Sequence, residues 1–166
     1  MNKWGNKLLK IRRPDLYKGL INSLTFDKKQ WTNKVGEHIT EELCLLQRQE
    51  FYKKLTVIVT ESGWKYNPDV ETEQDIIEVK TQTYHTHGTA DEKILGVVIK
   101  YAEVPRLINK NLKIVCIGGA EKASREKHGV LSGVRCNPEK QMLLDCAKKL
   151  RMEYLGASDI LKALLN

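Results

Sequence analysis

Apolar residues recur at helical spacing between Thr32 and Lys54, with charged residues between them. The apolar positions are Val35, Ile39, Leu43, Leu46 and Phe51. Because positions three to four apart share one face of a helix, this segment is predicted to be one long amphipathic helix with its apolar face in the core.

Short runs rich in β-branched residues predict strands. In chain order they are Leu55–Thr60, Tyr66–Val70, Gln74–Tyr84 and Leu112–Ile117, with a short edge strand at Glu153–Leu155. The run Leu112–Ile117 is almost entirely apolar, which is typical of a strand covered on both faces of a sheet. The two glycines after it predict a tight exit turn. They lack the spacing of the glycine-rich motifs that bind nucleotide phosphates, so no nucleotide cofactor is expected.

Three further helices are predicted in the second half of the chain. The first begins at Thr89, which can cap it while Glu92 reaches back, and it runs toward Ala102 ahead of Pro105. The others are Ser158–Leu165 and Pro138–Arg151, the latter with an apolar stripe of Met142, Leu143, Cys146 and Leu150. The order helix, three strands, helix, strand, helix, strand, helix predicts an α/β domain with a mixed sheet of four to five strands flanked by helices.

The composition fits one globular domain over residues 1–166, without repeats or a Pro/Gly-rich linker. We expect a basic N-terminal arm at 1–34, a core at 35–120 and a C-terminal helical completion at 121–166. No apolar run approaches the roughly 20 residues needed to cross a bilayer, and no secretory signal is evident, so a cytoplasmic protein without membrane contact is expected. The four cysteines are scattered without a Cys-x-x-Cys pair, which predicts reduced and mostly buried thiols.

The net charge of +7 is concentrated at one end of the chain. Residues 1–34 hold nine Lys or Arg against two Asp, so this segment accounts for the whole net charge. A basic segment of this kind suits contact with nucleic-acid phosphates, and a solvated basic surface is the alternative interpretation. The residues of the arm expected to bind DNA are Lys7, Lys10, Arg12 and Arg13.

Acidic residues cluster between Asp69 and Glu78, and two ionisable residues lie inside the predicted strand Gln74–Tyr84. Glu78 and Lys80 stand there among Ile and Val, where charged groups are costly unless they are paired or bind a metal. Side chains alternate along a strand, so Glu78, Lys80 and Gln82 share a face.

A hairpin that turns at Glu73-Gln74 would place Asp69 directly opposite Glu78, with Cβ atoms about 5 Å apart. Two carboxylates at this separation suit Mg²⁺, with Mn²⁺ as a substitute. The metal would activate a water for phosphodiester hydrolysis, while Lys80 orients that water or stabilises developing charge. Gln82 continues the row and could position a nucleic-acid strand.

The segment Pro68-Asp69, eight intervening residues and then Glu78-Val79-Lys80 resembles the signature of the PD-(D/E)xK nuclease superfamily, which includes restriction endonucleases, Holliday-junction resolvases and repair nucleases. The resemblance implies a restriction-endonuclease-like core and Lys80 as the third catalytic residue. Many members place a glutamate on the first core helix, and Glu37 is the candidate here, with Glu41 as second choice. The metal ligands implied are Asp69, Glu78, Val79 and Glu37.

The run from Glu78 to Tyr84, followed by Gly88 to Gly96, resembles small type II restriction endonucleases of bacteria and large DNA viruses. This resemblance implies a Mg²⁺-dependent endonuclease acting on double-stranded DNA, expected as a homodimer because two antiparallel strands need two sites. A structure-selective nuclease, such as a junction resolvase or repair enzyme, is one alternative. A catalytically inactive DNA-binding protein with a structural ion pair is another. Recognition would come from the basic arm and from the segment Ser124–Cys136.

Other residues carry weaker indications. His85 and His87 follow the predicted catalytic strand and are expected to contact DNA phosphates or solvent rather than zinc. Lys93 lies on the same side of its helix as Lys100, in a row that faces either phosphates or solvent. The tryptophans Trp4, Trp31 and Trp64 are candidates for core anchors, and Trp4 could instead stack on a base.

Overall fold

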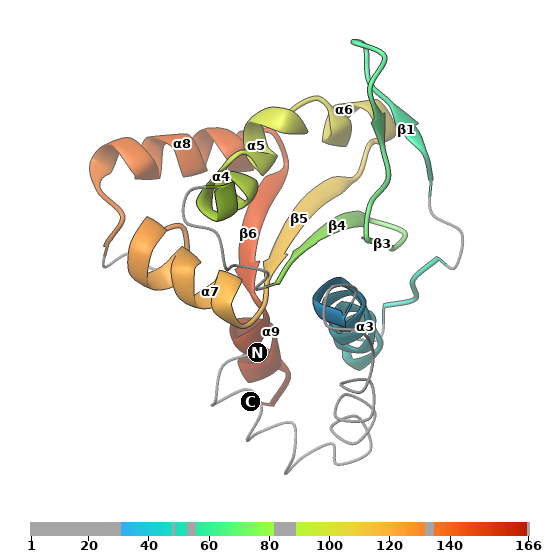
Figure 1. Cartoon of the computed structure of the whole chain (residues 1–166). Coiled ribbons are helices and arrows are strands. Elements are labelled where there is room, and N and C mark those ends of the chain that lie inside the picture. Colours follow the sequence, from blue (N-terminus) through green and yellow to red (C-terminus); the bar gives the residue numbers. More distant parts are fainter. Residues whose placement is uncertain (1–30, 48, 53–55, 82–88, 132–134, 166) are drawn as a thin grey trace.

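A computed structural model describes residues 31–47, 49–52, 56–81, 89–131 and 135–165 (Figure 1). The helices are α3 (Trp31–Leu46), α4 (Thr89–Leu95), α5 (Val97–Lys100), α6 (Val104–Ile108), α7 (Gly119–Ala123), the π-helix η1 (Ser124–His128), α8 (Pro138–Lys149) and α9 (Ala157–Leu165). The strands are β1 (Ile58–Val59), β2 (Lys65–Tyr66), β3 (Val70–Glu71), β4 (Asp75–Lys80), β5 (Asn111–Cys116) and β6 (Met152–Gly156).

The main sheet has the order β3-β4-β5-β6, in which β3 is antiparallel to β4 and the other neighbours are parallel. The predicted α/β class, with a mixed sheet of four strands flanked by helices, is confirmed. The prediction of one strand over Tyr66–Val70 is wrong. The segment divides into β2, which pairs with β1 in a separate hairpin, and β3. Pro68 lies between the two strands, and proline lacks the N–H that a continuous ladder would require.

The two faces of the main sheet carry separate apolar clusters, and helices lie on both of them (Figure 1). On one face, α3 and α9 pack against Ile77 and Val115. On the other, Ile76 and Ile114 pack with residues of α4–α8 and the β1–β2 hairpin. Successive residues of β4 therefore point to opposite faces, as the alternation of a strand requires.

Helix α3 lies very close to β4 at Gly36. A Cβ built on this glycine would overlap the side chain of Thr81 and lie 2.9 Å from Cγ1 of Val79. The buried face of α3 carries Ile39 and Leu43, as predicted. The prediction that the helix continues to Lys54 is wrong: it ends at Leu46, and a few residues later Phe51 forms a β-bridge with Thr72.

The predicted helix from Thr89 to Ala102 begins where expected but is interrupted. It ends at Leu95, and Gly96 separates it from the four-residue α5. A further helix, α6, carries Pro105 in its first turn, a position where the missing N–H costs nothing. Pro105 therefore lies at the start of a helix, whereas the sequence pattern predicts only the end of a helix ahead of it.

The predicted apolar stripe of α8 is not in the core. Met142 and Leu143 are each 68% exposed and Leu150 is 46% exposed. Cys146 is also exposed, although the cysteines were expected to be mostly buried; Cys44 and Cys116 are. The buried residue of this helix is Ala147, which packs in the same cluster as β5 and β6. Helix α8 therefore contacts the sheet through a small side chain and leaves Met142, Leu143 and Leu150 largely in solvent.

Two buried ion pairs hold the turn between β3 and β4. Glu71 is 2% exposed and accepts a hydrogen bond from Nζ of Lys110 at 2.7 Å. Asp75, also 2% exposed, accepts one from Nζ of Lys113 at 2.6 Å. Acids on either side of Glu73-Gln74 thus anchor this hairpin to α6–β5, which fixes its register.

Among the described helices, none has both the length and the apolar character needed to span a bilayer.

Candidate active site

The β3–β4 hairpin brings Asp69 and Glu78 together. Val70 pairs with Ile77 in the antiparallel ladder, so the next position outward places Asp69 opposite Glu78. The backbone N–H of Asp69 also donates to the carbonyl of Ile77 at 3.1 Å. The predicted cross-strand arrangement of these two acids is therefore the one that the fold adopts.

The carboxylate of Asp69 is largely enclosed and crowded by negative charge. Its Oδ2 accepts a hydrogen bond from the backbone N–H of Val79 at 2.7 Å. The pKa of Asp69 is raised to about 7, by burial first and then by the charges of Glu78 and Glu37, against the lowering effects of the Val79 N–H and of Lys80. A divalent cation bound between the two carboxylates would stabilise the ionised form of Asp69.

Glu78 is held by one donor on each of its oxygens. The hydroxyl of Tyr66 donates to Oε2 at 3.1 Å, and Nζ of Lys80 donates to Oε1 at 2.5 Å. Burial and the charge of Glu78 raise the pKa of the Tyr66 phenol, so the tyrosine stays a proton donor. Each carboxylate oxygen has a second lone pair, so these contacts fix the orientation of Glu78 and still leave it able to bind a cation.

Glu78 and Lys80 open onto a cavity of about 490 Å³ between β4 and helices α4 and α5. Its other lining residues are Glu92, Lys93, Gly96, Val97, Lys100 and Tyr101. Three lysines thus surround the cavity, which suits a polyanion. Lys93, predicted to bind DNA, belongs to it, and so does Lys100, for which a solvated face was the competing interpretation.

Two tyrosines form the aromatic wall next to this cavity. The rings of Tyr66 and Tyr101 lie 4.1 Å apart between centroids, and Nζ of Lys100 lies 4.8 Å from the Tyr101 centroid. Hydrogen bonding to Tyr101 raises the pKa of Lys100, and the charge of Glu78 raises it further. Sequence reasoning did not identify either tyrosine, because Tyr66 comes from the hairpin beside the main sheet and Tyr101 from beyond the end of α5.

Helix α3 contributes Glu37 at longer range. Its charge raises the pKa of Asp69, whereas Glu41, the second choice, lies 3.8 Å from His38 on the same helix. The aliphatic side chain of Val79 packs toward α3, and its backbone carbonyl is the one oxygen that this residue could offer to a metal. Within the part of the chain that the structure describes, no three His, Cys, Asp or Glu side chains form a group that could hold a metal ion. Protein carboxylates would supply two ligands, in keeping with the several waters that Mg²⁺ retains.

Other predicted site residues lie outside the described residues: Lys7, Lys10, Arg12, Arg13, Gln82, His85 and His87. In the segment Ser124–Cys136, Arg125 was a candidate for recognition. Its guanidinium instead lies 3.0 Å from Glu121 and 2.5 Å from Asp159, which indicates that it holds α9 against α7.

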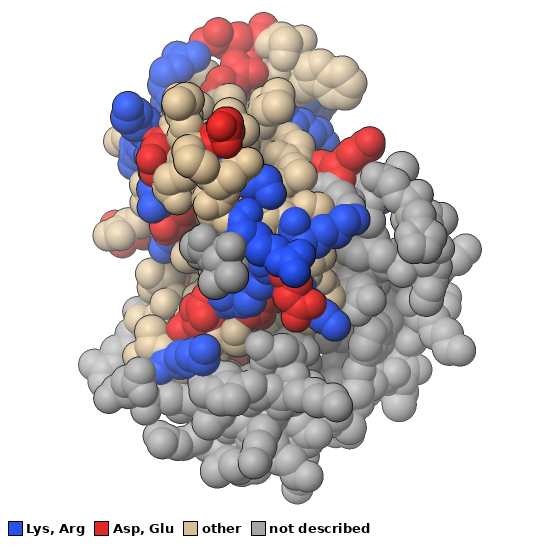
Figure 2. All heavy atoms as spheres, turned by 90° about the vertical axis from the view of Figure 1, so that its left-hand side faces the viewer, with Lys and Arg blue, Asp and Glu red and all other residues tan. Residues whose placement is uncertain are grey.

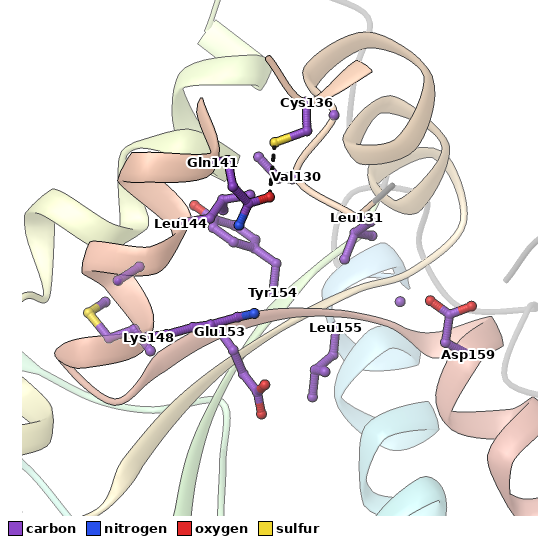
Figure 3. A pocket seen from close by; sticks show the side chains of 14 residues that line it. Val130, Leu131, Cys136, Gln141, Leu144, Lys148, Glu153, Tyr154, Leu155 and Asp159 are labelled. Carbon is purple, nitrogen blue, oxygen red and sulfur yellow. Dashed lines mark hydrogen bonds between the residues drawn. The ribbon is translucent and has the colours of Figure 1, made fainter. Parts of the chain in front are cut away.

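A second cavity, of about 290 Å³, lies between α8, β6, residues 129–131 and Cys136 (Figure 3). Val130, Leu131 and Leu144 form part of its wall. Sγ of Cys136 lies 3.6 Å from Oε1 of Gln141 at one end. This cavity lacks a cluster of lysines, and it does not suit a polyanionic ligand.

Basic side chains also gather on the face that includes α7 and α8, where acidic side chains stand between them (Figure 2). Exposed lysines of these two helices include Lys122, Lys148 and Lys149. Because charges of both signs are mixed on this face, it singles out no anion-binding site.

Comparison of the chain with protein-family models, with curated proteins and with solved structures finds no match in any of the three.

Proposed function

We propose that the chain is a Mg²⁺-dependent nuclease that hydrolyses phosphodiester bonds in DNA. The observation that carries the proposal is the convergence of Asp69 and Glu78 from neighbouring strands, with Lys80 bonded to Glu78 at the mouth of a lysine-lined cavity. The raised pKa of Asp69 supports it, since strongly perturbed ionisable groups in a cleft are typical of functional sites.

Asp69 and Glu78 would hold the metal, leaving its other positions to water and a phosphate oxygen. When bound, Mg²⁺ lowers the pKa of a coordinated water and neutralises charge on the phosphate. Tyr66 keeps Glu78 oriented through its hydroxyl. Lys80 lies at the cavity and can direct its ammonium toward the reacting phosphate, where positive charge stabilises the transition state.

Lys93 and Lys100 would bind the phosphates next to the scissile one. Both line the cavity, from α4 and α5 respectively. Contacts with successive phosphates do not read sequence, but they fix the position of a nucleic-acid strand. The row of lysines therefore supports a polynucleotide as the substrate rather than a small phosphate ester.

The resemblance to small type II restriction endonucleases favours sequence-specific cleavage by a homodimer, in which a twofold axis supplies one site to each strand. A structure-selective nuclease is the second candidate. It is favoured by Trp64, which is 74% exposed on the hairpin that carries Tyr66.

Cleavage of a sequenced plasmid with Mg²⁺ tests the proposal. We expect Lys80→Ala to cut at least about 100-fold more slowly while still binding DNA, because one group that stabilises transition-state charge contributes about that factor. Lys149→Ala, an exposed lysine on α8, is the matched control and should cut normally. Cleavage by Lys80→Ala at the normal rate would refute the assignment. Binding without cleavage by the wild type, with Mg²⁺ or Mn²⁺, would instead indicate an inactive DNA-binding protein.

Mapping the cut ends separates the two candidate functions. Discrete bands at one short sequence support restriction-like cleavage, whereas preferential cutting of branched DNA supports a structure-selective nuclease. Sedimentation of the protein with and without DNA measures whether a dimer forms.

A further inference from the structure

The β1–β2 hairpin presents a large aromatic side chain to solvent beside the candidate active site. Trp64 is 74% exposed, although tryptophan is highly buried on average. It had been a candidate for a core anchor, and the structure contradicts that interpretation. We propose that Trp64 stacks on an unpaired nucleobase of DNA bound in the Glu78 cavity. The inference rests on the proposed function only in taking DNA as the ligand.

The pairing in the hairpin places Trp64 on the same face as Tyr66, which contacts Glu78. Thr60 and Trp64 face each other at the end of the hairpin, where the N–H of Thr60 donates to the carbonyl of Trp64 at 2.8 Å. Trp64 directly precedes β2, and its pairing with Thr60 continues the register of Ile58 with Tyr66, so the side chains of Trp64 and Tyr66 leave the same face about 6.6 Å from each other. Since the Tyr66 hydroxyl contacts Glu78 at 3.1 Å, the row Glu78, Tyr66, Trp64 leads outward from the carboxylates.

The hairpin is braced, so the indole stands on a fixed support. The backbone N–H of Trp64 donates to Oγ1 of Thr60 at 3.0 Å, and Gly63 takes a φ of +82° in the turn. Glu61 bonds to Arg106, and its N–H donates to Glu103 at 3.2 Å, which ties the turn to α6. An aromatic side chain with two torsions on a rigid support loses little entropy when a ligand stacks on it.

The chemistry next to Trp64 favours a nucleobase over a protein partner. The cavity that Glu78 and Lys80 line also contains Lys93 and Lys100. Lysines around a cavity, together with an exposed aromatic side chain on the neighbouring hairpin, are a combination that binds single-stranded nucleic acid without sequence preference. Bases within a continuous duplex are already stacked on both sides, so Trp64 would select DNA with an unpaired base near the scissile phosphate.

Binding of the full-length protein to fluorescently labelled DNA, in EDTA to prevent cleavage, tests the inference. The probes are a 20-nucleotide single strand and the matching duplex, titrated with the wild type and with Trp64→Ala. Stacking on a base predicts about five- to 100-fold weaker single-strand binding by Trp64→Ala, with duplex binding changed less than about twofold. Trp64→Phe, which keeps an aromatic ring, should recover part of the loss.

Val59→Ala is the matched control. Val59 is 57% exposed on the opposite face of the hairpin, so its truncation should leave both affinities unchanged. Thermal melts of each variant establish that the fold is intact. Unchanged single-strand binding by Trp64→Ala, or an equal loss for single strand and duplex, would overturn the inference.

The outcomes separate this inference from the proposed nuclease activity. Lys80→Ala should stop cleavage yet keep the tighter single-strand binding that depends on Trp64. A wild-type protein that never cleaves DNA but loses single-strand affinity on Trp64→Ala would refute the nuclease and support the stacking. A wild-type protein that cleaves DNA, combined with unchanged binding by Trp64→Ala, would support the nuclease and refute the stacking.

Discussion

The buried carboxyl of Asp69 predicts a dependence of folding stability on pH that a single substitution removes. Its pKa is raised from 3.8, the value for an unperturbed carboxyl, to about 7 in the folded protein. Between these two pH values the folded state binds one proton more than the unfolded state. The free energy of unfolding therefore falls as pH rises, by about 1.4 kcal/mol per pH unit.

The contribution of Asp69 is fully present below pH 3.8 and is lost as pH rises through 7. From pH 5 to pH 8 the free energy of unfolding falls by roughly 2–3 kcal/mol. The fall stops near pH 7, because above that pH the carboxyl is ionised in both the folded and the unfolded state. Asp69→Asn keeps the size of the side chain and cannot titrate. Relative to this variant, the wild type should lose that amount of stability across the interval, while titrating groups distant from Asp69 contribute equally to both proteins.

Urea unfolding at pH 5, 6, 7 and 8, in EDTA, measures the difference. Parallel stability curves for the wild type and Asp69→Asn would refute the reasoning, because they would mean that this carboxyl ionises normally. Addition of Mg²⁺ at pH 8 extends the test, since a ligand that binds only the folded protein raises its stability by mass action. Mg²⁺ should stabilise the wild type and leave Asp69→Asn unchanged; equal stabilisation of both would place the metal elsewhere.

Three other substitutions test contacts that position the site. Tyr66→Phe removes the hydroxyl that donates to Glu78 but keeps the ring, so we expect a stability loss of about 1–2 kcal/mol by urea unfolding and Mg²⁺-dependent cleavage slowed about 10-fold in a single-turnover assay. Gly36→Ala forces α3 away from β4 and should cost about 1–3 kcal/mol in the same unfolding assay; a neutral effect would contradict their close approach. Glu71→Gln leaves the ammonium of Lys110 in a largely buried place without its counter-charge, with an expected loss of about 3–5 kcal/mol in thermal unfolding that Lys110→Met should partly recover.

The pairing of Asp69 with Glu78 could be predicted because it depends on local information. Strand alternation and the position of the turn at Glu73-Gln74 determine which residues face each other in a hairpin. The buried acids next to that turn, Glu71 and Asp75, then hold the register through ion pairs with lysines that follow later in the chain. The two-residue spacing of Glu78 and Lys80 likewise puts both on one face without any knowledge of the tertiary fold.

The parts that could not be predicted depend on which elements pack together. Tyr66 reaches Glu78 only because the β1–β2 hairpin lies beside the face of β4 that carries Glu78. The apolar residues of α8 follow helical spacing, yet Met142 and Leu143 face solvent and Ala147 faces the sheet. Periodicity indicates that a helix has an apolar face, but only tertiary packing decides whether a neighbour covers it.

The ion pair of Lys80 with Glu78 could serve stability alone, and the charges around it argue against that interpretation. A structural pair neutralises itself, and the remaining groups nearby need no further compensation. Here Lys80 contacts Glu78, yet the pKa of Asp69 is still raised by burial and by the charges of Glu78 and Glu37. This raised pKa means that folding holds the ionised carboxylate at a cost in free energy above pH 7. Stability alone would favour an uncharged residue at this position. A partly buried carboxylate next to a second carboxylate fits a site built to bind a cation.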